Sequence, residues 1–290
     1  MEEIVVISGK GGTGKTTLAA SFAVLAGGDL VLADADVDAA NLSLLLTPEQ
    51  LESHPFIASS VAVLDRERCT ECGLCRELCR FDAISEDYRI EPISCEGCTV
   101  CSRACPEEAI AMEEVVSGHW FLSQTPYGKL VHARLGIAEE NSGRLVTLVR
   151  NEARELAKAE QKKYLLTDGP PGIGCPVIAS LSGATKALIV TEPTISGIHD
   201  LKRVLQVCRQ FDVPPAVCIN RCDLDEENTR TIEAYCAGES VEVAAKIPFY
   251  REVTEALIRA KPVVSYTEGP AAADIARLWG NISANGSQAD

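Results

Sequence analysis

Short apolar runs alternate along this chain with stretches whose apolar residues recur at helical spacing. Six runs predict strands, at 4–7, 30–33, 164–167, 187–191, 216–219 and 242–247. Between them, the stretch that begins at Leu145 has its apolar residues on one face of a helix. Strands that are apolar throughout and alternate with helices are typical of parallel sheets. The chain is therefore predicted to be an α/β protein with a mostly parallel sheet flanked by helices.

This alternation stops between residues 61 and 116 and then resumes. The simplest arrangement is one domain of residues 1–60 and 117–290, with a small domain of residues 61–116 inserted into it. The inserted segment has 13 Asp and Glu, six Arg and no Lys, an excess of seven negative charges. A partner that docks there is expected to be basic, although the same charges also suit a plain solvated surface.

The first apolar run leads into a glycine-rich loop. The sequence GKGGTGKT at 9–16 matches the phosphate-binding pattern G-x4-G-K-[ST], and a helical stretch follows it. Glycines let the backbone N–H groups turn toward phosphate oxygens, and the helix N-terminus adds its dipole. A P-loop NTPase fold follows from this pattern. The expected nucleotide-binding residues in the loop are Gly11, Gly12, Thr13, Gly14, Lys15, Thr16 and Thr17.

Eight cysteines form two matching runs. Cys69, Cys72, Cys75 and Cys79 recur 26 residues later as Cys95, Cys98, Cys101 and Cys105. The spacing C-x2-C-x2-C-x3-C resembles that of bacterial ferredoxins with two 4Fe–4S clusters, in which the fourth cysteine of each run ligates the other cluster. The resemblance assigns one cluster to Cys69, Cys72, Cys75 and Cys105, and the second to Cys95, Cys98, Cys101 and Cys79. The chain departs from the ferredoxin pattern at Arg80, because the equivalent position after Cys105 is Pro106.

Two other uses of these cysteines fit less well. Structural zinc takes four ligands per ion, usually from two separated pairs, unlike two uninterrupted runs. Disulfides would require an oxidising compartment, which nothing in the sequence indicates. The five remaining cysteines are expected to be small buried hydrophobic residues. They are Cys175, Cys208, Cys218, Cys222 and Cys236.

A second lysine, Lys10, follows the first glycine of the loop. With it, the loop resembles the deviant Walker A motif of the MinD and nitrogenase iron-protein class of ATPases. The segments DADVDAANL at 34–42 and DGPPG at 168–172 resemble the two switch segments of that class. With its cysteine-rich insert, which would form a small α+β ferredoxin-like domain, the chain resembles the ferredoxin-containing subgroup of MinD-like ATPases.

The resemblance to this class implies roles for individual residues. Lys10 would reach across a homodimer interface to the nucleotide of the second subunit, Asp36 would position the attacking water, and Lys15 would hold the outer phosphates. Gly172 would sense the γ-phosphate through its backbone, and Asp38 is expected to be a surface charge. The Mg²⁺ site would be formed, directly or through water, by Thr16, Asp34 and Asp168.

The base would be read by a segment after the apolar run 216–219. Asn220, Arg221 and Asp223 lie where the class recognises adenine, and Pro248 would pack along the ring. The pattern N-R-x-D also resembles the guanine-reading N-K-x-D of GTPases, which leaves GTP as the alternative. ATP is the preferred nucleotide because the deviant loop belongs to an ATPase class.

Charge and hydropathy exclude several partners. The net charge of −15 argues against nucleic acid and anionic lipid, and no apolar run reaches the length of a membrane span. The N-terminus lacks the positive region of a secretion signal, and residues 280–290 have no basic amphipathic face. A cytoplasmic protein without a membrane helix is expected.

Two classes of function fit these features. In the first, Mg-ATP binding and hydrolysis close and open a homodimer, or a dimer with a paralogue. This cycle is coupled to the redox chemistry or docking of two 4Fe–4S clusters, with electron transfer to a protein partner. In the second, a regulatory or cluster-assembly ATPase uses its clusters to sense redox state or iron, or donates a cluster to a client enzyme. A purely structural role for the clusters is a further possibility.

Overall fold

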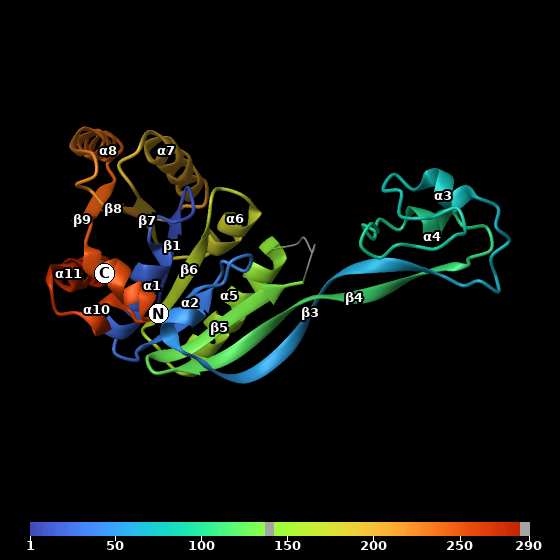
Figure 1. Cartoon of the computed structure of the whole chain (residues 1–290), viewed down its shortest axis with the longest axis horizontal. Helices are drawn as coiled ribbons and strands as arrows, with labels where there is room; N and C mark the ends of the chain where they lie inside the picture. Colours follow the sequence, from blue (N-terminus) through green and yellow to red (C-terminus); the bar gives the residue numbers. More distant parts are fainter. Residues whose placement is uncertain (137–141, 285–290) are drawn as a thin grey trace. The chain divides into compact units, whose positions relative to one another are not determined.

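The computed structural model describes residues 1–136 and 142–284, and the chain divides into two compact units (Figure 1). The larger unit consists of Met1–Ser53, Trp120–Arg134 and the described residues from Ser142 onward. The smaller unit, called the cysteine unit below, consists of His54–His119 and residues 135 and 136. It contains residues 61–116, the interval in which the alternation of predicted strands and helices stops. The boundaries of the inserted domain stay a prediction.

Helices and strands alternate along most of the described chain. In order, the elements are β1 (Glu2–Ser8), α1 (Lys15–Leu25), β2 (Leu30–Asp34), α2 (Leu42–Leu46), β3 (Glu49–Leu64), α3 (Leu74–Leu78), α4 (Val100–Ala104), β4 (Ile110–Thr125), β5 (Gly128–Leu135), α5 (Ser142–Ala159), β6 (Tyr164–Pro171), α6 (Cys175–Leu181), β7 (Lys186–Thr191), α7 (Ile195–Gln210), β8 (Pro215–Asn220), α8 (Glu226–Gly238), β9 (Glu242–Ile247), α9 (Arg251–Ile258), α10 (Val263–Tyr266) and α11 (Pro270–Ala284).

Within the described residues, nine strands form one sheet in the order β3-β4-β5-β2-β6-β1-β7-β8-β9. Strand β1 lies between β6 and β7 and is parallel to both, and β2–β5, β2–β6, β7–β8 and β8–β9 are also parallel pairs. Helices pack on the sheet (Figure 1). The predicted α/β fold with a mostly parallel, helix-flanked sheet is confirmed, and all six predicted strands are present.

Strand β1 shows how the sequence builds two cores, one on each face of the sheet. Successive side chains of a strand point to opposite faces. Ile4 and Val6 belong to the core that includes Phe22 of α1 and helix α11, whereas Val5 and Ile7 belong to the core with α6, α7 and α8. Because β1 is covered on both sides, each of its apolar side chains contributes about 1.5–3 kcal/mol by burial.

The start of β1 is tied to α5 by a buried ion-pair group. Arg150 is 2% exposed and donates from Nη1 to the backbone oxygens of Ala179 (2.8 Å) and Ser182 (2.7 Å). Its Nη2 donates to Glu3 Oε2 at 3.0 Å, and Arg154 donates to both carboxylate oxygens of Glu3. A carboxylate removed from water is stable only with such partners, so these contacts fix the register of β1 against α5.

The 26-residue repeat of the sequence recurs in the backbone of the cysteine unit. Helices α3 and α4 have the same length and lie 26 residues apart. Left-handed backbone conformations also recur at this offset, in the pairs Glu71 and Gly97, Gly73 and Thr99, and Asp82 and Glu108. Since a non-glycine residue enters this region only under constraint, the paired values indicate two copies of one local fold.

Strands β3, β4 and β5 were not predicted. β3 and β4 each have 16 residues, and most of the β3 side chains are at least partly exposed. A strand without a continuous apolar side has no pattern that distinguishes it from a loop. None of the described helices is both long and apolar enough to cross a membrane.

Candidate functional site

The predicted phosphate-binding loop connects β1 to α1 at the carboxyl edge of the sheet. Gly12 and Gly14 have φ values of 78° and 102°, which L side chains rarely adopt. A Cβ on Gly14 would also lie 2.6 Å from Asn220 Nδ2. Next to Gly11 and Gly12 nothing lies within 4 Å of a built Cβ, so the loop borders open space where phosphates can approach the backbone.

Lys15 begins α1 and is buried, 6% exposed. Its Nζ donates to Ser8 Oγ at 2.9 Å, and Ser8 Oγ in turn donates to the backbone oxygen of Lys10 at 2.6 Å. Burial lowers the pKa of the Lys15 ammonium, and the nearby carboxylates Asp168 and Asp36 oppose that effect. A buried cation with only one hydroxyl acceptor has donor capacity left for anionic phosphate oxygens.

Three carboxylates face this lysine from the ends of β2 and β6. Asp34 and Asp168 are paired in register on these neighbouring strands, and both are buried. Burial raises the pKa of Asp168 to about 7, with a hydrogen bond from Thr16 acting in the opposite direction. Burial and the charge of Asp168 raise the pKa of Asp34 well above its usual range, and burial also raises the pKa of Asp36. The site therefore concentrates negative charge away from water.

The donor atoms at this point suit a magnesium ion. Asp168 Oδ1 is buried and has no hydrogen-bond partner among the described residues. The Thr16 hydroxyl lies beside the same carboxylate. Hydroxyl and carboxylate oxygens are the ligands that Mg²⁺ takes in nucleotide sites, usually together with water and phosphate. Asp34 instead accepts hydrogen bonds from the backbone N–H groups of Asp36 and Leu42, both at 3.2 Å.

The Lys10 side chain lies outside the group formed by Lys15 and the three carboxylates. Its Nζ lies 3.2 Å from Glu192 Oε2 and donates to Thr194 Oγ1 at 3.3 Å. Glu192 also forms an ion pair with Arg221. Glu192 and Thr194 were not predicted; the available signal was the pair of polar residues in Glu-Pro-Thr, directly after strand β7, where parallel sheets place site residues.

The predicted base-recognition residues are brought next to the loop. Asn220 Nδ2 donates to the backbone oxygen of Thr13 at 2.7 Å, while its Oδ1 accepts from the N–H of Arg221. Asp223 accepts from the N–H of Phe249 at 2.7 Å and so fixes the turn that contains Pro248. The Asn220 amide thus links β8 to the phosphate loop. Its contact with the base stays a prediction.

A large open pocket of the larger unit joins these parts. Its lining includes most of the predicted nucleotide site: Gly11, Gly12, Gly14, Lys15, Thr16, Thr17, Asp36, Asn220, Arg221 and Pro248. Asp38 also lines it and is exposed, as expected for a surface charge. Lys10, Thr13, Asp34, Asp168, Gly172 and Asp223 are not part of this lining. Gly172 has a φ of 96° and donates its N–H to the backbone oxygen of Ser8 at 2.8 Å.

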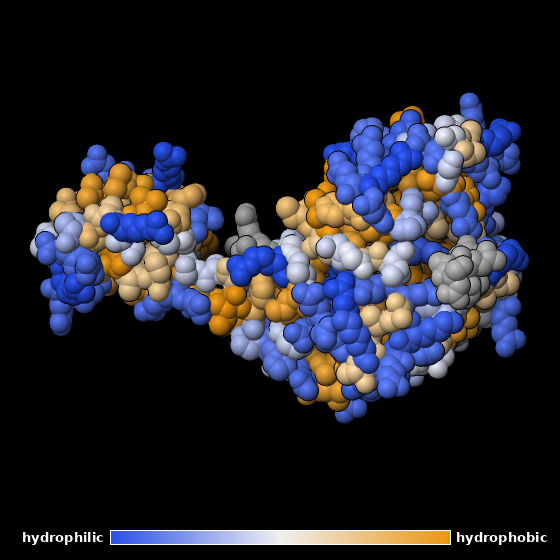
Figure 2. Space-filling model, turned by 180° about the vertical axis from the view of Figure 1, so that it is seen from behind, coloured by the Kyte–Doolittle hydropathy of each residue, from blue (hydrophilic) through white to orange (hydrophobic). Residues whose placement is uncertain are grey.

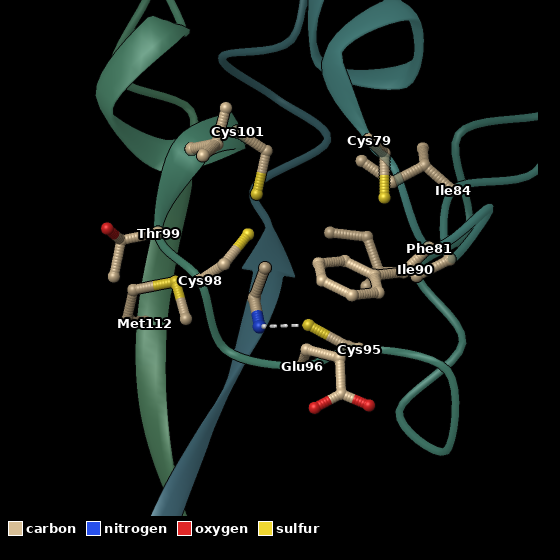
Figure 3. A pocket seen from close by; sticks show the side chains of 13 residues that line it. Cys79, Phe81, Ile84, Ile90, Cys95, Glu96, Cys98, Thr99, Cys101 and Met112 are labelled. Atoms are coloured by element: carbon tan, nitrogen blue, oxygen red, sulfur yellow. Dashed lines mark hydrogen bonds between the residues drawn. The ribbon is translucent and has the colours of Figure 1, made fainter.

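The cysteine unit has a cavity into which four sulfur atoms point (Figure 3). Cys79, Cys95, Cys98 and Cys101 line it together with apolar side chains, among them Phe81, Ile84, Ile90 and Met112. Three of the cysteines come from one run and Cys79 from the other. This cavity is called the Cys98 cavity below, after its exposed cysteine. The Cys95 sulfur accepts a hydrogen bond from the N–H of Ala62 at 3.5 Å.

A second cavity of the same unit holds the other four cysteines. Cys69, Cys72, Cys75 and Cys105 line it with Leu64, Leu74, Tyr88 and Ile110. It is called the Cys72 cavity below. Backbone N–H groups of Glu71 and Ala109 donate to the sulfurs of Cys69 (3.4 Å) and Cys105 (3.3 Å). The structure therefore brings together the same two sets of four cysteines that the ferredoxin resemblance assigns to two clusters.

The chemistry of these donor sets fits iron–sulfur clusters. Four thiols in an apolar pocket, with backbone N–H groups aimed at sulfur, are the environment in which such clusters are held and tuned. In residues 1–136 and 142–284, no three His, Cys, Asp or Glu side chains are grouped closely enough to ligate a single metal ion.

The other five cysteines were predicted to be buried, which is correct for three. Cys208, Cys218 and Cys236 are buried, and burial raises the pKa of each thiol, to about 12 for Cys208 and about 11 for Cys236. Cys175 is exposed at the start of α6, and Cys222 is half-buried. The prediction is wrong for these two because Cys175 is the exposed first residue of α6 and Cys222 lies in the turn after β8, so neither belongs to the sheet core.

Comparison with known proteins places the chain in a family. The family described as CobQ/CobB/MinD/ParA nucleotide binding domain matches residues 4–263. An uncharacterized protein of Methanocaldococcus jannaschii is 33% identical over 228 residues, which are 78% of this chain and 80% of that protein. The septum site-determining protein MinD of Bacillus subtilis is 25% identical over 76% of this chain and 65% of its own length.

The fold is also that of solved MinD structures. MinD of Pyrococcus horikoshii, solved in complex with Mg-ADP, superposes with a TM-score of 0.62 at 19% identity, over 99% of this chain and 97% of that one. With a family match over most of its length, the chain belongs to the CobQ/CobB/MinD/ParA nucleotide-binding family, as a P-loop ATPase of the MinD/ParA type.

Proposed function

We propose that this chain is a homodimeric ATP-driven switch that carries two 4Fe–4S clusters and couples its nucleotide state to the redox chemistry or docking of a protein partner. The observation that supports this most is the sorting of eight cysteines into two cavities of four, each with three ligands from one run and one from the other. In this proposal, residues 61–116 form a ferredoxin-like domain inserted between the ATPase segments 1–60 and 117–290.

The nucleotide half of the proposal follows from the loop. Lys15 and the loop N–H groups would bind the phosphates of ATP, and Thr16 and Asp168 would hold Mg²⁺ with support from Asp34. Bound Mg²⁺ neutralises phosphate charge. Asp36 lines the pocket on the side of Lys15 and would orient the attacking water. The complex of Pyrococcus horikoshii MinD with Mg-ADP supports this assignment by likeness of fold.

Dimer formation is supported by the position of Lys10. It carries a charge next to the phosphate loop but does not line the pocket of its own chain. Release from Glu192 would free the ammonium group for a nucleotide bound to a second copy, which makes the loop a deviant Walker A motif in function as well as in sequence. Asn220 and Pro248 would receive the adenine of ATP.

The redox half of the proposal assigns one cluster to each cavity. Cys79, Cys95, Cys98 and Cys101 would hold one, and Cys69, Cys72, Cys75 and Cys105 the other. A bound 4Fe–4S cluster supplies a one-electron redox couple whose potential depends on charge, hydrogen bonds to sulfur and solvent exposure. The apolar walls and the backbone N–H groups aimed at sulfur are this chain's own contribution to that potential.

The test is an anaerobic redox titration of the reconstituted protein with EPR detection, with and without Mg-ATP. Two clusters predict about eight irons per chain. The proposal expects nucleotide to shift a cluster potential or spectrum in the natural chain but not in Lys15→Ala. Eight irons with nucleotide-independent potentials and spectra would contradict a coupling to redox chemistry and leave only coupling through partner docking, and a chain that cannot be loaded with iron would contradict the clusters themselves.

A further inference from the structure

The two cysteine cavities are related by the 26-residue repeat, so each position at the rim of one has an equivalent at the rim of the other. Phe81 follows Cys79 by two residues, as Glu107 follows Cys105, and Ile93 precedes Cys95 by two, as Glu67 precedes Cys69. At two equivalent positions next to the cysteines, the residue is thus apolar beside the Cys98 cavity and acidic beside the Cys72 cavity. The repeat provides an internal comparison in which the local backbone is the same and the side chains differ.

The apolar side chains at the Cys98 cavity face solvent. Phe81 and Val100 line this cavity and are 45% and 43% exposed, and Ile93 is 81% exposed. Cys98 itself is exposed, as is its equivalent Cys72. Figure 2 shows apolar side chains gathered on a face of the smaller unit. Phe81 and Ile93 are large apolar side chains exposed to water, whereas their equivalents at the other cavity are charged. Such exposure indicates a surface that another molecule covers.

The charges around the two cavities also differ. Next to the Cys72 cavity, Arg68 pairs with Glu108 (3.8 Å) and Arg76 with Glu86 (2.9 Å), so two of the acidic side chains there are compensated within the unit. Glu96 lines the Cys98 cavity, and its carboxylate points away from the sulfurs (Figure 3). In the described part of the chain, neither Glu96 nor Asp82, the neighbour of Phe81, has an ion-pair partner.

We infer that the rim of the Cys98 cavity, formed by Phe81, Ile93, Val100 and Glu96, is the docking surface for a basic electron-transfer protein. The inference rests on the proposed function, and it specifies the kind of partner protein and the surface on which that partner docks. An apolar centre with uncompensated acidic groups at the edge complements a partner that has an apolar patch surrounded by Lys and Arg. The partner docked there lies over Cys98, the exposed sulfur of this cavity. At the Cys72 cavity, Leu74 is the exposed equivalent of Val100, but Glu107 and Glu67 stand where the Cys98 cavity has Phe81 and Ile93.

The inference can be tested with cytochrome c, a small basic electron-transfer protein, as the probe. The reconstituted full chain is titrated anaerobically by calorimetry at low ionic strength with zinc-substituted cytochrome c, so that binding is measured apart from any redox reaction. Ile93→Gln and Phe81→Gln remove apolar contact without changing charge, and Leu74→Gln is the matched control at the Cys72 cavity. Glu96→Gln removes one charge, and its control is Glu107→Gln, which changes the net charge equally.

The Ile93 and Phe81 variants should each weaken binding about ten-fold, as truncation of a central apolar contact does. Glu96→Gln should weaken it about three-fold and reduce its salt dependence. The two control variants should bind the probe with an affinity within about two-fold of that of the natural chain. Equal losses at both cavities, unchanged affinity in the Cys98-cavity variants, or no binding by the natural chain would overturn the inference.

The iron content of every variant is measured in parallel. Because Ile93 is largely exposed, its substitution should not disturb folding. Variants that hold about eight irons yet bind the probe unchanged overturn the docking surface and leave the proposed function standing. A natural chain that holds no iron overturns the proposed function and, with it, the inference.

Discussion

The buried carboxylates of the proposed magnesium site should make the nucleotide-free protein less stable as the pH rises. Burial raises the pKa of Asp168 from 3.8 to about 7 in the folded chain. Because the folded-state pKa is the higher one, the folded protein binds more protons than the unfolded chain between about pH 4 and 7. The contribution to stability is full below pH 4 and is lost as the pH rises through 7.

The size of the effect follows from the shift. About three pKa units at about 1.4 kcal/mol each correspond to about 4 kcal/mol between pH 4 and pH 8. Asp168→Asn keeps the shape of the side chain but cannot ionise. We therefore expect this variant, without nucleotide, to be about 2–4 kcal/mol more stable than the natural chain at pH 8 and nearly equal to it at pH 4.5.

Urea unfolding of the nucleotide-free larger unit, within the full chain, measures this directly at pH 4.5 and pH 8. Asp38→Asn is the matched control, because Asp38 lines the same pocket but is exposed. It should keep the pH dependence of the natural chain. Mg-ADP should stabilise the natural chain at pH 8 and have little effect on Asp168→Asn. If the natural chain and Asp168→Asn have the same unfolding free energy at pH 8, burial of the ionised Asp168 carboxylate does not carry the cost ascribed to it.

Four further changes test other parts of the molecule. Gly14→Ala should abolish nucleotide binding in calorimetry, because its φ is left-handed and its Cβ would meet Asn220; binding within ten-fold of the natural chain would contradict this. Asp36→Ala should bind Mg-ATP but slow hydrolysis at least about a hundred-fold in a phosphate-release assay, and normal turnover would assign the water to another group. Arg150→Met should lower the unfolding free energy by about 3–5 kcal/mol, since it leaves the buried Glu3 carboxylate with one partner fewer and removes two hydrogen bonds to partly buried carbonyls. Cys101→Ser should remove the EPR signal of one cluster and about four irons; loss of the signal that Cys75→Ser removes would refute the assignment of cysteines to cavities.

The parts of the fold that sequence predicts are those in which burial dictates composition. Strands such as β1 and β7 are covered on both faces, so each has a run of four consecutive apolar residues at its centre, Ile4–Ile7 in β1 and 187–190 in β7. The loop from Gly9 to Thr16 is equally readable, because its backbone conformation and its ligand both restrict the residue at each position.

Strands β3 and β4 escape prediction for the opposite reason. Their side chains are largely accessible to water, so no apolar period marks them, and the pairing of one with the other is a long-range property. Glu192 was missed because its role depends on two partners, Lys10 and Arg221, that are far from it in sequence. A single sequence shows which residue types are present at a strand end but not which of them meet.

The crossing of one cysteine from each half to the cavity of the other has a consequence for the cysteine unit. A single 26-residue half contains three of the four sulfurs that its own cavity needs and one that it cannot use alone. Such a half has four sulfurs around its cavity only when a second half lends its last cysteine. With both halves in one chain the exchange is intramolecular, and the surroundings of the two cavities can differ, as Phe81 and Glu107 do.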